Sequence, residues 1–213
     1  MKSEVTEITR CAWCGSDPDY IRYHDTEWGV PQKDSQRLFE FLVLECAQAG
    51  LSWITILRKR EGYRAVFDDF LPEILADWPD ERLHDALQSQ DIVRNRLKVH
   101  SVRQNAIAVI ALERSGITLS DYLWSFVGHE PQVNRWHALD EVPARTALSA
   151  EISRDMKQRG FAFVGPTIMY AFMQATGMVN DHLTSCFRHR ECVEKARDPQ
   201  FTGKPVDKAK NNT

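Results

Sequence analysis

The sequence lacks any apolar run that approaches the roughly 20 residues needed to cross a bilayer. Its opening segment, MKSEVTEITR, has no apolar centre of the kind that marks a secretory signal. A membrane protein and a secreted protein are therefore both disfavoured. We expect a cytoplasmic protein that has no membrane partner.

The sequence also contains few cysteines and carries little net charge. Five cysteines are a small, odd number, which disfavours a disulfide framework and favours reduced thiols. A net charge of −3 argues against a protein that holds nucleic acid mainly by nonspecific attraction, although it is compatible with a local basic face. With 43% hydrophobic and 27% charged residues over 213 positions, the chain is expected to form one core or two small lobes that share a cleft.

The alternation that marks strands is missing, and so is any internal repeat, whereas apolar stripes at helical spacing run through most of the chain. Capping residues, prolines and glycines divide these stripes into helices. The predicted helices cover 34–49, 52–67, 71–78, 80–88, 92–114, 120–128, 149–160 and 166–177, with a loop at 128–146 and a last helix, capped by Asn180 or Asp181, that holds the HLTSC motif. We expect a flexible extension at 1–10, a helical domain at 11–192 and a disordered polar tail at 193–213.

Two segments at opposite ends of the chain contain candidate metal ligands. His182 and Cys186 are four residues apart and would share a face of the predicted last helix. The opening stretch CAWCGSDPDYIRYHDTEWG offers His24 and either Cys11 or Cys14. Two cysteines and two histidines would bind zinc tetrahedrally and join the two ends, with Cys192 and His189 as spare candidates. The CxxC pair could instead be redox-active, but no strand precedes it.

The stretch RGFAFVGPTIMY, residues 159–170, contains a glycine-bounded turn between two predicted helices. Such a helix-hairpin-helix directs backbone N–H groups at a phosphate, whereas the alternative is a plain helical corner. The generic DNA-binding turn reads glycine, apolar, glycine, but here Phe163 stands at the first of those positions. Basic residues precede the turn and favour the DNA interpretation, namely Arg154, Lys157 and Arg159.

Glu45 interrupts an apolar helical stripe, where a buried carboxylate is costly unless something pairs with it. One interpretation is a structural salt bridge with an arginine. The other is a pocket wall, with Trp53 facing the same space from beyond the turn at 50–51. A carboxylate beside aromatic faces suits a flat, cationic ligand.

Several blocks, in order, resemble the DNA-3-methyladenine glycosylase I family of bacteria: YHDTEWGVP, LECAQAGLSWITIL, WSFV, RGFAFVG and MVNDH. The resemblance covers about 11–186, and phenylalanine in the hairpin turn is the family's own form. It implies an all-α, two-lobed helix-hairpin-helix glycosylase fold with a structural zinc ion that joins the termini. The implied zinc ligands are Cys11, His24, His182 and Cys186, with Cys14 as an extra cysteine.

The resemblance also implies the function and the site. The chain would release free 3-methyladenine from double-stranded alkylated DNA, as a bacterial cytoplasmic monomer, and would not cut the strand. Asn180 stands where many superfamily relatives carry a catalytic aspartate, and Asp181 is displaced by one position and expected to point elsewhere. The implied base-binding residues are Trp13, Tyr20, Tyr23, Trp53 and Glu45, which is also the catalytic candidate. The implied DNA-binding residues are Gly50, Leu51, Gly160, Phe161, Phe163, Val164 and Gly165.

Two other classes of function compete with this one. A noncatalytic, zinc-stabilised protein that binds DNA lesions would share the hairpin and the metal site but would release no base. A redox module built on Cys11 and Cys14 would depend on Cys14 and would have no affinity for DNA.

Overall fold

The computed structural model describes residues 8–197, which form ten α-helices, three short 3-10 helices and one pair of two-residue strands. The α-helices are α1 (Pro18–Thr26), α2 (Ser35–Gln48), α3 (Trp53–Val66), α4 (Pro72–Leu75), α5 (Asp80–Ala86), α6 (Arg96–Arg114), α7 (Leu119–Ser125), α8 (Ala147–Gln158), α9 (Pro166–Ala175) and α10 (Phe187–Ala196). The 3-10 helices are η1 (Ala12–Cys14), η2 (Asp68–Phe70) and η3 (Leu139–Glu141). Strands β1 (Gln132–Val133) and β2 (Val179–Asn180) pair in parallel.

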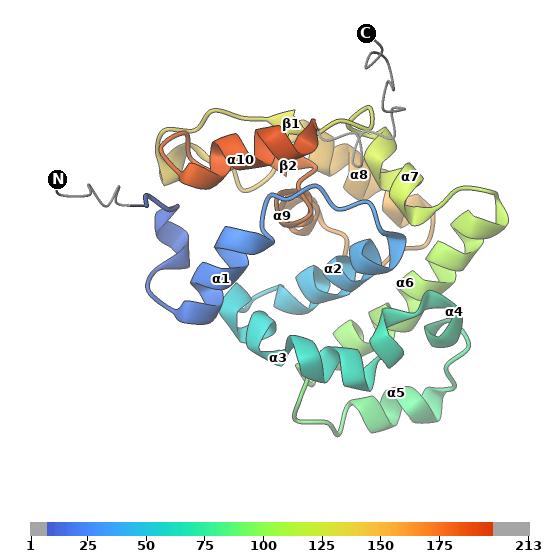
Figure 1. Cartoon of the computed structure of the whole chain (residues 1–213). Coiled ribbons are helices and arrows are strands. Elements are labelled where there is room, and N and C mark those ends of the chain that lie inside the picture. The colour runs from blue at the N-terminus through green and yellow to red at the C-terminus, as the bar shows by residue number, and fades with distance from the viewer. Residues whose placement is uncertain (1–7, 198–213) are drawn as a thin grey trace, which may run out of the picture.

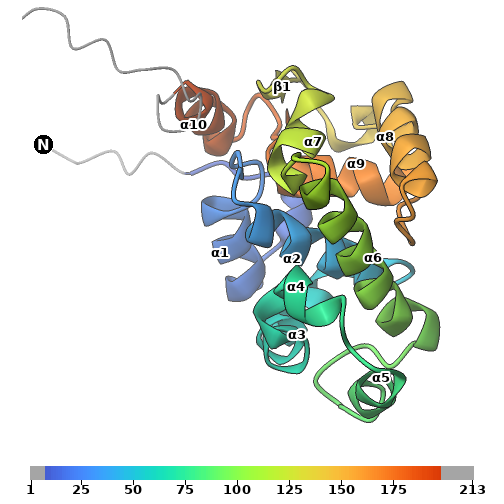
Figure 2. The same cartoon turned by 90° about the vertical axis from the view of Figure 1, so that its right-hand side faces the viewer.

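The expected all-α, two-lobed architecture is confirmed. Helix α2 runs through the middle, with α3, α4 and α5 below it and α9 and α10 above it, while α1 packs on α3 (Figure 1). In the orthogonal view α8 lies beside α9, and α6 passes along α4 (Figure 2). Within the described residues, no helix is both long and apolar enough to cross a membrane.

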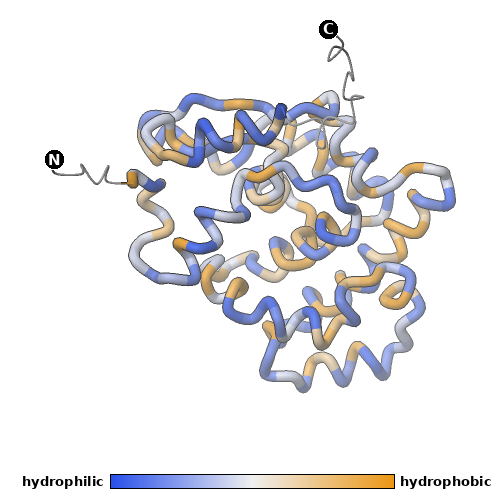
Figure 3. The backbone as a smooth tube through the Cα atoms, in the orientation of Figure 1, coloured by the Kyte–Doolittle hydropathy of each residue, from blue (hydrophilic) through white to orange (hydrophobic). Residues whose placement is uncertain are grey.

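Helix α2 forms the centre of the core. Every residue from Leu38 to Ala47 is buried, including the two glutamates Glu40 and Glu45. Apolar colour marks α2 and α9 in the middle of the molecule, whereas α10 on the outside is mostly hydrophilic (Figure 3). A helix that is buried around most of its circumference holds any polar side chain in a water-poor setting, so each glutamate of α2 needs a partner or a function.

Local capping sets most helix starts. The Asp34 side chain accepts a hydrogen bond from the backbone N–H of Arg37 and begins α2, as predicted. Helix α8 begins earlier than the predicted cap Ser149, because Thr146 caps it and exchanges two side-chain-to-backbone hydrogen bonds with Ser149. Helix α6 begins at Arg96, where the Asn95 side chain accepts from the N–H of Lys98, and not at 92.

The prediction for the C-terminal region is wrong. Residues 181–186 are irregular, with a turn at 184–185, so HLTSC is not helical, and the last helix, α10, begins only at Phe187. It continues to Ala196, past the expected start of the tail at 193. The segments 1–7 and 198–213, where a flexible extension and a disordered tail are expected, lie outside the described residues.

Helix α1 and the strand pair were not predicted from the sequence. Asp17 caps α1 by accepting from the N–H groups of Asp19 and Tyr20, and Pro18 occupies its first position. This capped turn orients the aromatic residues of the opening stretch toward the centre of the molecule.

Candidate active site and metal centre

A cavity of about 310 Å³ is lined by residues from both ends of the chain and from its middle. Five of the lining residues are aromatic: Trp13, Tyr20, Tyr23, Trp28 and Trp53. The ring of Trp13 lies 5.1 Å from that of Tyr20 and 5.0 Å from that of Trp28, while the rings of Tyr23 and Trp53 are 5.4 Å apart. The predicted base-binding residues therefore meet around one space, which is large enough for a single flat base.

Three polar groups at this cavity are buried and have no hydrogen-bond partner among the described residues. They are Nε1 of Trp13, the hydroxyl of Tyr23 and Nε1 of Trp53. Burial raises the pKa of Tyr23, so its hydroxyl stays protonated. Buried donors are normally satisfied, and orphaned ones beside a cavity indicate that a ligand completes them.

The two buried glutamates of α2 differ sharply in their surroundings. Glu40 accepts hydrogen bonds from Arg37 at 2.6 Å, from Arg60 at 2.5 Å and from Arg64 at 2.8 Å. Glu45 is 3% exposed, lines the cavity, and has no hydrogen bond or ion pair within residues 8–197. The structural salt bridge that was the alternative for Glu45 is thus found at Glu40, five positions earlier.

Burial without a cationic partner changes the acidity of Glu45. Desolvation raises its pKa to about 8, since the charged form loses hydration and gains nothing in return. Near neutral pH the carboxyl group is therefore largely protonated and can offer an O–H as well as an acceptor. A perturbed carboxyl group in an aromatic cavity is typical of a functional site.

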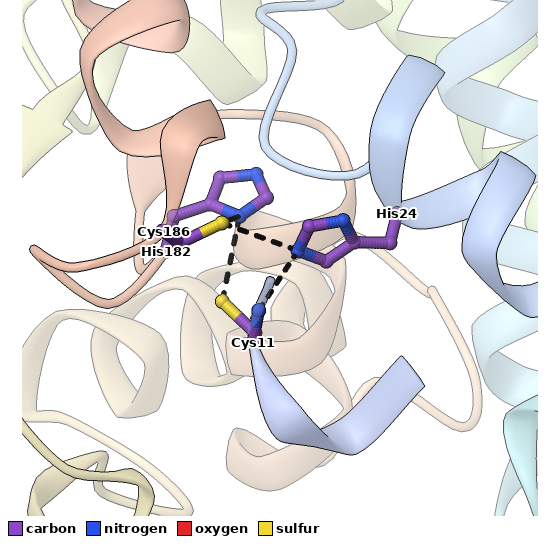
Figure 4. A group of neighbouring side chains, drawn as sticks. All are labelled: Cys11, His24, His182 and Cys186. Carbon is purple, nitrogen blue, oxygen red and sulfur yellow. Dashed lines mark hydrogen bonds between the residues drawn. The ribbon is translucent and has the colours of Figure 1, made fainter. Parts of the chain in front are cut away.

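The four predicted metal ligands come together. The ligand atoms of Cys11, His24, His182 and Cys186 all lie within 4.8 Å of one another, and all four residues are buried (Figure 4). Each Sγ lies 3.6 Å from Nδ1 of His182, and Sγ of Cys186 lies 3.4 Å from Nε2 of His24. Tetrahedral zinc with its usual bond lengths separates sulfur and nitrogen ligands by about 3.5 Å, so the donor set fits a zinc ion.

The outer ring nitrogens of both histidines are also held. Nδ1 of His24 lies 2.7 Å from the carboxylate of Asp25, which in turn binds Arg10, and Nε2 of His182 lies 3.0 Å from the carbonyl oxygen of Trp28. These contacts leave Nε2 of His24 and Nδ1 of His182 facing the thiols. Metal-binding histidines are usually oriented by such a carboxylate or carbonyl.

The electrostatics of the cluster suit metal binding. A hydrogen bond from Cys11 lowers the pKa of Cys186, and the same bond raises the pKa of Cys11, so one thiolate is already favoured. Desolvation lowers the pKa of His182, which keeps its imidazole neutral. A metal ion requires thiolates and neutral imidazoles.

The remaining cysteines do not join this cluster. The thiol of Cys14 is buried and donates to the carbonyl oxygen of Cys11 at 3.2 Å. Burial raises the pKa of Cys192 to about 11, and Nε2 of the other spare candidate, His189, lies 2.8 Å from the carbonyl oxygen of Asn134. All five cysteines are free thiols, and Cys14 is not an exposed, acidic thiol of the kind a redox pair needs.

The predicted hairpin is present as α8, a turn and α9. Gly160 has a φ of 91°, Phe163 has a φ of 57°, and Gly165 precedes α9 without any side-chain cap. Phe161 and Val164 are buried and anchor the turn. Because the first turn of a helix leaves its N–H groups unpaired, this uncapped start offers donors to an anion.

Three side chains from other helices hold the hairpin turn. Asn105 is fully buried, accepts from the N–H of Ala162 at 2.7 Å and donates to its carbonyl at 3.3 Å. Gln104 donates to the carbonyl of Gly160 at 2.9 Å, and the Cys46 thiol donates to the carbonyl of Phe163 at 3.4 Å. These bonds fix a strained turn against α2 and α6.

The turn at 50–51 connects α2 and α3 near the cavity. Gly50 has a φ of 80°, and Leu51 is 40% exposed. Lys98 of α6 holds this turn in place: its Nζ donates to the carbonyls of Ala47 and Ala49 at 2.8 and 2.6 Å. Arg103 of the same helix pairs with Asp80, whereas Arg94 and Arg96 are exposed.

Sequence reasoning missed several residues that line the cavity, among them Trp28 and Asp181. Trp28 belongs to the aromatic-rich opening stretch, which is the signal that could have identified it. Asp181 was expected to point elsewhere, but it lines the cavity, whereas Asn180 turns away and donates to the carbonyl of His189 at 2.9 Å. The error arose because β2 and a turn, not a helix, carry these residues.

Known proteins provide an independent comparison. Residues 13–189 match the model of a family described as methyladenine glycosylase. The chain is 49% identical over 179 residues to the DNA-3-methyladenine glycosylase 1 of Escherichia coli, which covers 84% of this chain and 96% of that protein.

Solved structures of proteins with this family's activity in their names are also similar to this chain. A crystal structure of 3-methyladenine DNA glycosylase I superposes with a TM-score of 0.83 and 49% identity, covering 84% of this chain and 98% of that one. The Staphylococcus aureus enzyme, described for the structural basis of 3-methyladenine recognition, superposes with a TM-score of 0.81 and 35% identity, covering 84% of this chain and 95% of that one.

Proposed function

Because the chain belongs to the methyladenine glycosylase family, we propose that it is a DNA glycosylase that hydrolyses the N-glycosidic bond of 3-methyladenine. The reaction releases the free base and leaves an abasic site for base excision repair. The single observation that carries this function is the aromatic cavity, whose donors on Trp13, Tyr23 and Trp53 are buried and unpaired beside Glu45. Relatives of this chain are named for the same activity.

Base recognition follows from the cavity. Rings of Trp13, Tyr20, Tyr23 and Trp53 would stack on or border the extruded base. Glu45 would exchange a hydrogen bond with the edge of the base, and the orphaned donors would select a base that presents acceptors to them. A normal base that is extruded would leave one or more of these groups unpaired, which disfavours its binding.

The substrate supplies much of the driving force. Alkylation places positive charge on the base, so it departs as a neutral molecule and the glycosidic bond is already weak. The protein must extrude the nucleotide, which costs a few kcal/mol and less for a damaged base. Catalysis therefore depends on how the protein positions the nucleotide and on the charged groups around it. Glu45 is the candidate catalytic residue.

DNA would be gripped outside the cavity. The uncapped start of α9 and the turn that contains Gly160, Phe163 and Gly165 would bind a phosphate of duplex DNA. Leu51, exposed at the turn after Gly50, would fill the gap left by the extruded nucleotide. Exposed Arg154 and Lys157 on α8 add positive charge beside the hairpin.

Strand cleavage is not expected. Asn180 replaces the aspartate of other superfamily members, and the segment around it contains no lysine that could form a Schiff base. The enzyme would therefore be monofunctional. We infer further that it acts as a monomer in a bacterial cytoplasm, since one chain completes the cavity and its relatives are bacterial.

A structural zinc ion fits the four-residue cluster. Cys11, His24, His182 and Cys186 would hold it, and none of the four ligand positions is left for a substrate or water. When bound, the ion supplies cross-linking of distant segments and no reaction chemistry. Cys11 and Leu183 also border the cavity, so the metal centre supports one wall of the base site.

The direct test is to incubate the protein with methylated duplex DNA and to separate the released bases by chromatography. We expect free 3-methyladenine and an intact strand with abasic sites. Binding to methylated DNA without release of any base would show instead a noncatalytic lesion binder.

A further inference from the structure

Asp181 is the most heavily hydrogen-bonded carboxylate at the cavity. It is 3% exposed. Oδ1 accepts from the amide of Asn134 at 2.6 Å and from the indole of Trp136 at 2.8 Å. Oδ2 accepts from the hydroxyl of Tyr170 at 2.6 Å and from the amide of Gln174 at 2.8 Å.

These bonds define what the group can do. A carboxylate offers about four lone-pair sites, and four donors occupy them. In every one of these contacts Asp181 is the acceptor. With its acceptor sites filled, Asp181 cannot take a proton from water, and it can act on a ligand only through its charge.

That charge is not neutralised by a cation. All four donors are neutral, and within residues 8–197 Asp181 forms no ion pair. Asp181 lines the same cavity as Glu45 but reaches it from the turn after β2 rather than from α2. Glu45 has no donor around it and burial raises its pKa to about 8, whereas four donors surround the carboxylate of Asp181.

We propose that Asp181 is the fixed anion that stabilises positive charge on the deoxyribose while the N-glycosidic bond breaks. This rests on the proposed glycosylase function. The electron pair of the bond leaves with the cationic base, which departs as neutral 3-methyladenine. The sugar carbon left behind becomes cationic, a water oxygen adds to it, and the proton of that water passes to solvent. A preorganised charge aimed at the developing cation lowers this barrier without reorganisation.

A purely structural role is the competing explanation, because Asp181 also ties the segment of Asn134 and Trp136 to α9. The two roles differ in their sensitivity to ligand charge. If Asp181 has only a structural role, its loss should change the affinity of the cavity for all ligands to a similar degree. A fixed anion distinguishes a cationic sugar from a neutral sugar of the same shape.

The experiment compares two duplex oligonucleotides, one with a cationic pyrrolidine and one with a neutral tetrahydrofuran at the abasic position. At about pH 6.5, where Glu45 is mostly protonated, we expect the wild type to bind the pyrrolidine duplex roughly 30-fold more tightly than the tetrahydrofuran duplex. Asp181→Asn should reduce this ratio to within about threefold and slow single-turnover excision about 100-fold. Its affinity for free, neutral 3-methyladenine should change less than about threefold.

Two control variants separate charge from shape. Tyr170→Phe removes one hydrogen bond to Asp181 but keeps the anion, and Glu45→Gln removes the other carboxyl group; both should preserve the pyrrolidine preference. The proposal is overturned if the wild type shows no preference, if Asp181→Asn keeps it, or if Glu45→Gln abolishes it. If Asp181→Asn does not fold, the proposal is tested by the preference for the pyrrolidine duplex over the tetrahydrofuran duplex in the wild type and in Glu45→Gln. Absence of 3-methyladenine release by the wild type would refute the proposed function instead.

Discussion

Sγ of Cys11 lies 3.6 Å from Nδ1 of His182, although 171 positions separate the two residues in the sequence. Nearby, the backbone N–H of Phe187 donates to the carbonyl of Thr9 at 3.1 Å, so the two ends of the described chain also meet through the backbone. A metal ion at this junction would close nearly the whole chain into one loop, which restricts the unfolded state more than the folded one. Metal binding by these residues would therefore affect both the stability of the protein and the shape of the neighbouring cavity.

Purified protein should contain one zinc ion per chain. Cys186→Ser should lose the metal and melt several degrees lower, because a hydroxyl is a poor zinc ligand and a buried cluster is left incomplete. Cys14→Ser is the matched control and should keep the metal, since that thiol bonds only to the carbonyl of Cys11. Elemental analysis beside thermal unfolding gives the answer, and full zinc content in the Cys186 variant would refute the ligand assignment.

Gly29→Ala should damage the metal centre. Gly29 has a φ of 77°, and a Cβ there would lie 2.9 Å from the ring of His182. Gly116→Ala is the control, since its φ of 84° carries the same backbone strain, about 1–2 kcal/mol, with nothing within 4 Å. We expect both variants to lose stability but only Gly29→Ala to lose zinc. Equal metal content in the two variants would contradict this reading of the contact.

Glu45→Gln should change the pH dependence of stability. The pKa of Glu45 rises from 4.5 in its unburied form to about 8 in the fold, so folding binds a proton between these values. The wild-type free energy of unfolding therefore contains a contribution that falls as pH rises from about 4.5 to 8, by up to about 1.4 kcal/mol per pH unit. Glutamine lacks this contribution. The free energy of unfolding of the variant should therefore increase relative to that of the wild type as pH rises over this range. Denaturant unfolding at about pH 5.5 and 8 measures the difference, which must grow with pH.

The same substitution should weaken base recognition. Loss of the hydrogen bond from the neutral carboxyl group of Glu45 should cost roughly 0.5–1.5 kcal/mol, or up to about one decade, in binding or excision of 3-methyladenine. Glu40→Gln is the opposite case: it breaks the contacts with Arg37, Arg60 and Arg64, so stability should fall sharply while the folded fraction binds the base normally. A stable Glu45→Gln protein with unchanged base affinity would remove Glu45 from the base site.

Borohydride should trap no covalent complex with methylated DNA, and the DNA strand should remain intact after base release. The reason is that the sequence between Lys157 and Lys195, which includes Asn180, contains no lysine that could form a Schiff base. Gel electrophoresis before and after alkaline treatment of the product measures both points. A trapped adduct would assign the chain to the bifunctional glycosylases.

Asn105→Ala should weaken DNA binding without affecting the base site. Its side chain makes two hydrogen bonds to Ala162 in the hairpin turn, so their loss loosens the N–H groups offered to a phosphate. We expect affinity for undamaged duplex DNA to fall about five- to tenfold, with free 3-methyladenine affinity within about twofold of the wild type. Gln104→Ala, which loses a single exposed bond to Gly160, should show a smaller effect. A hairpin that does not contact DNA would leave the affinity of both variants unchanged.

Local chemistry allowed much of this protein to be predicted from its sequence. Asp34 predicts the start of α2, and Pro166 with Gly177 bounds α9, because capping and backbone restriction act within a few residues. The family blocks predicted the four residues that come together as a candidate metal site and four of the five aromatic residues of the cavity. Their positions in the sequence were sufficient, although the helical reason given for His182 and Cys186 was wrong.

The partner that each buried polar group meets depends on how whole elements pack against one another. Glu40 and Glu45 lie on one buried helix, yet arginines from the chain surround Glu40 and none reaches Glu45. Asp181 follows a two-residue strand rather than a helix cap, and that geometry turns it into the cavity and Asn180 out of it. Such contacts join residues far apart in sequence, and they depend on the packing of whole elements, which no short stretch of sequence encodes.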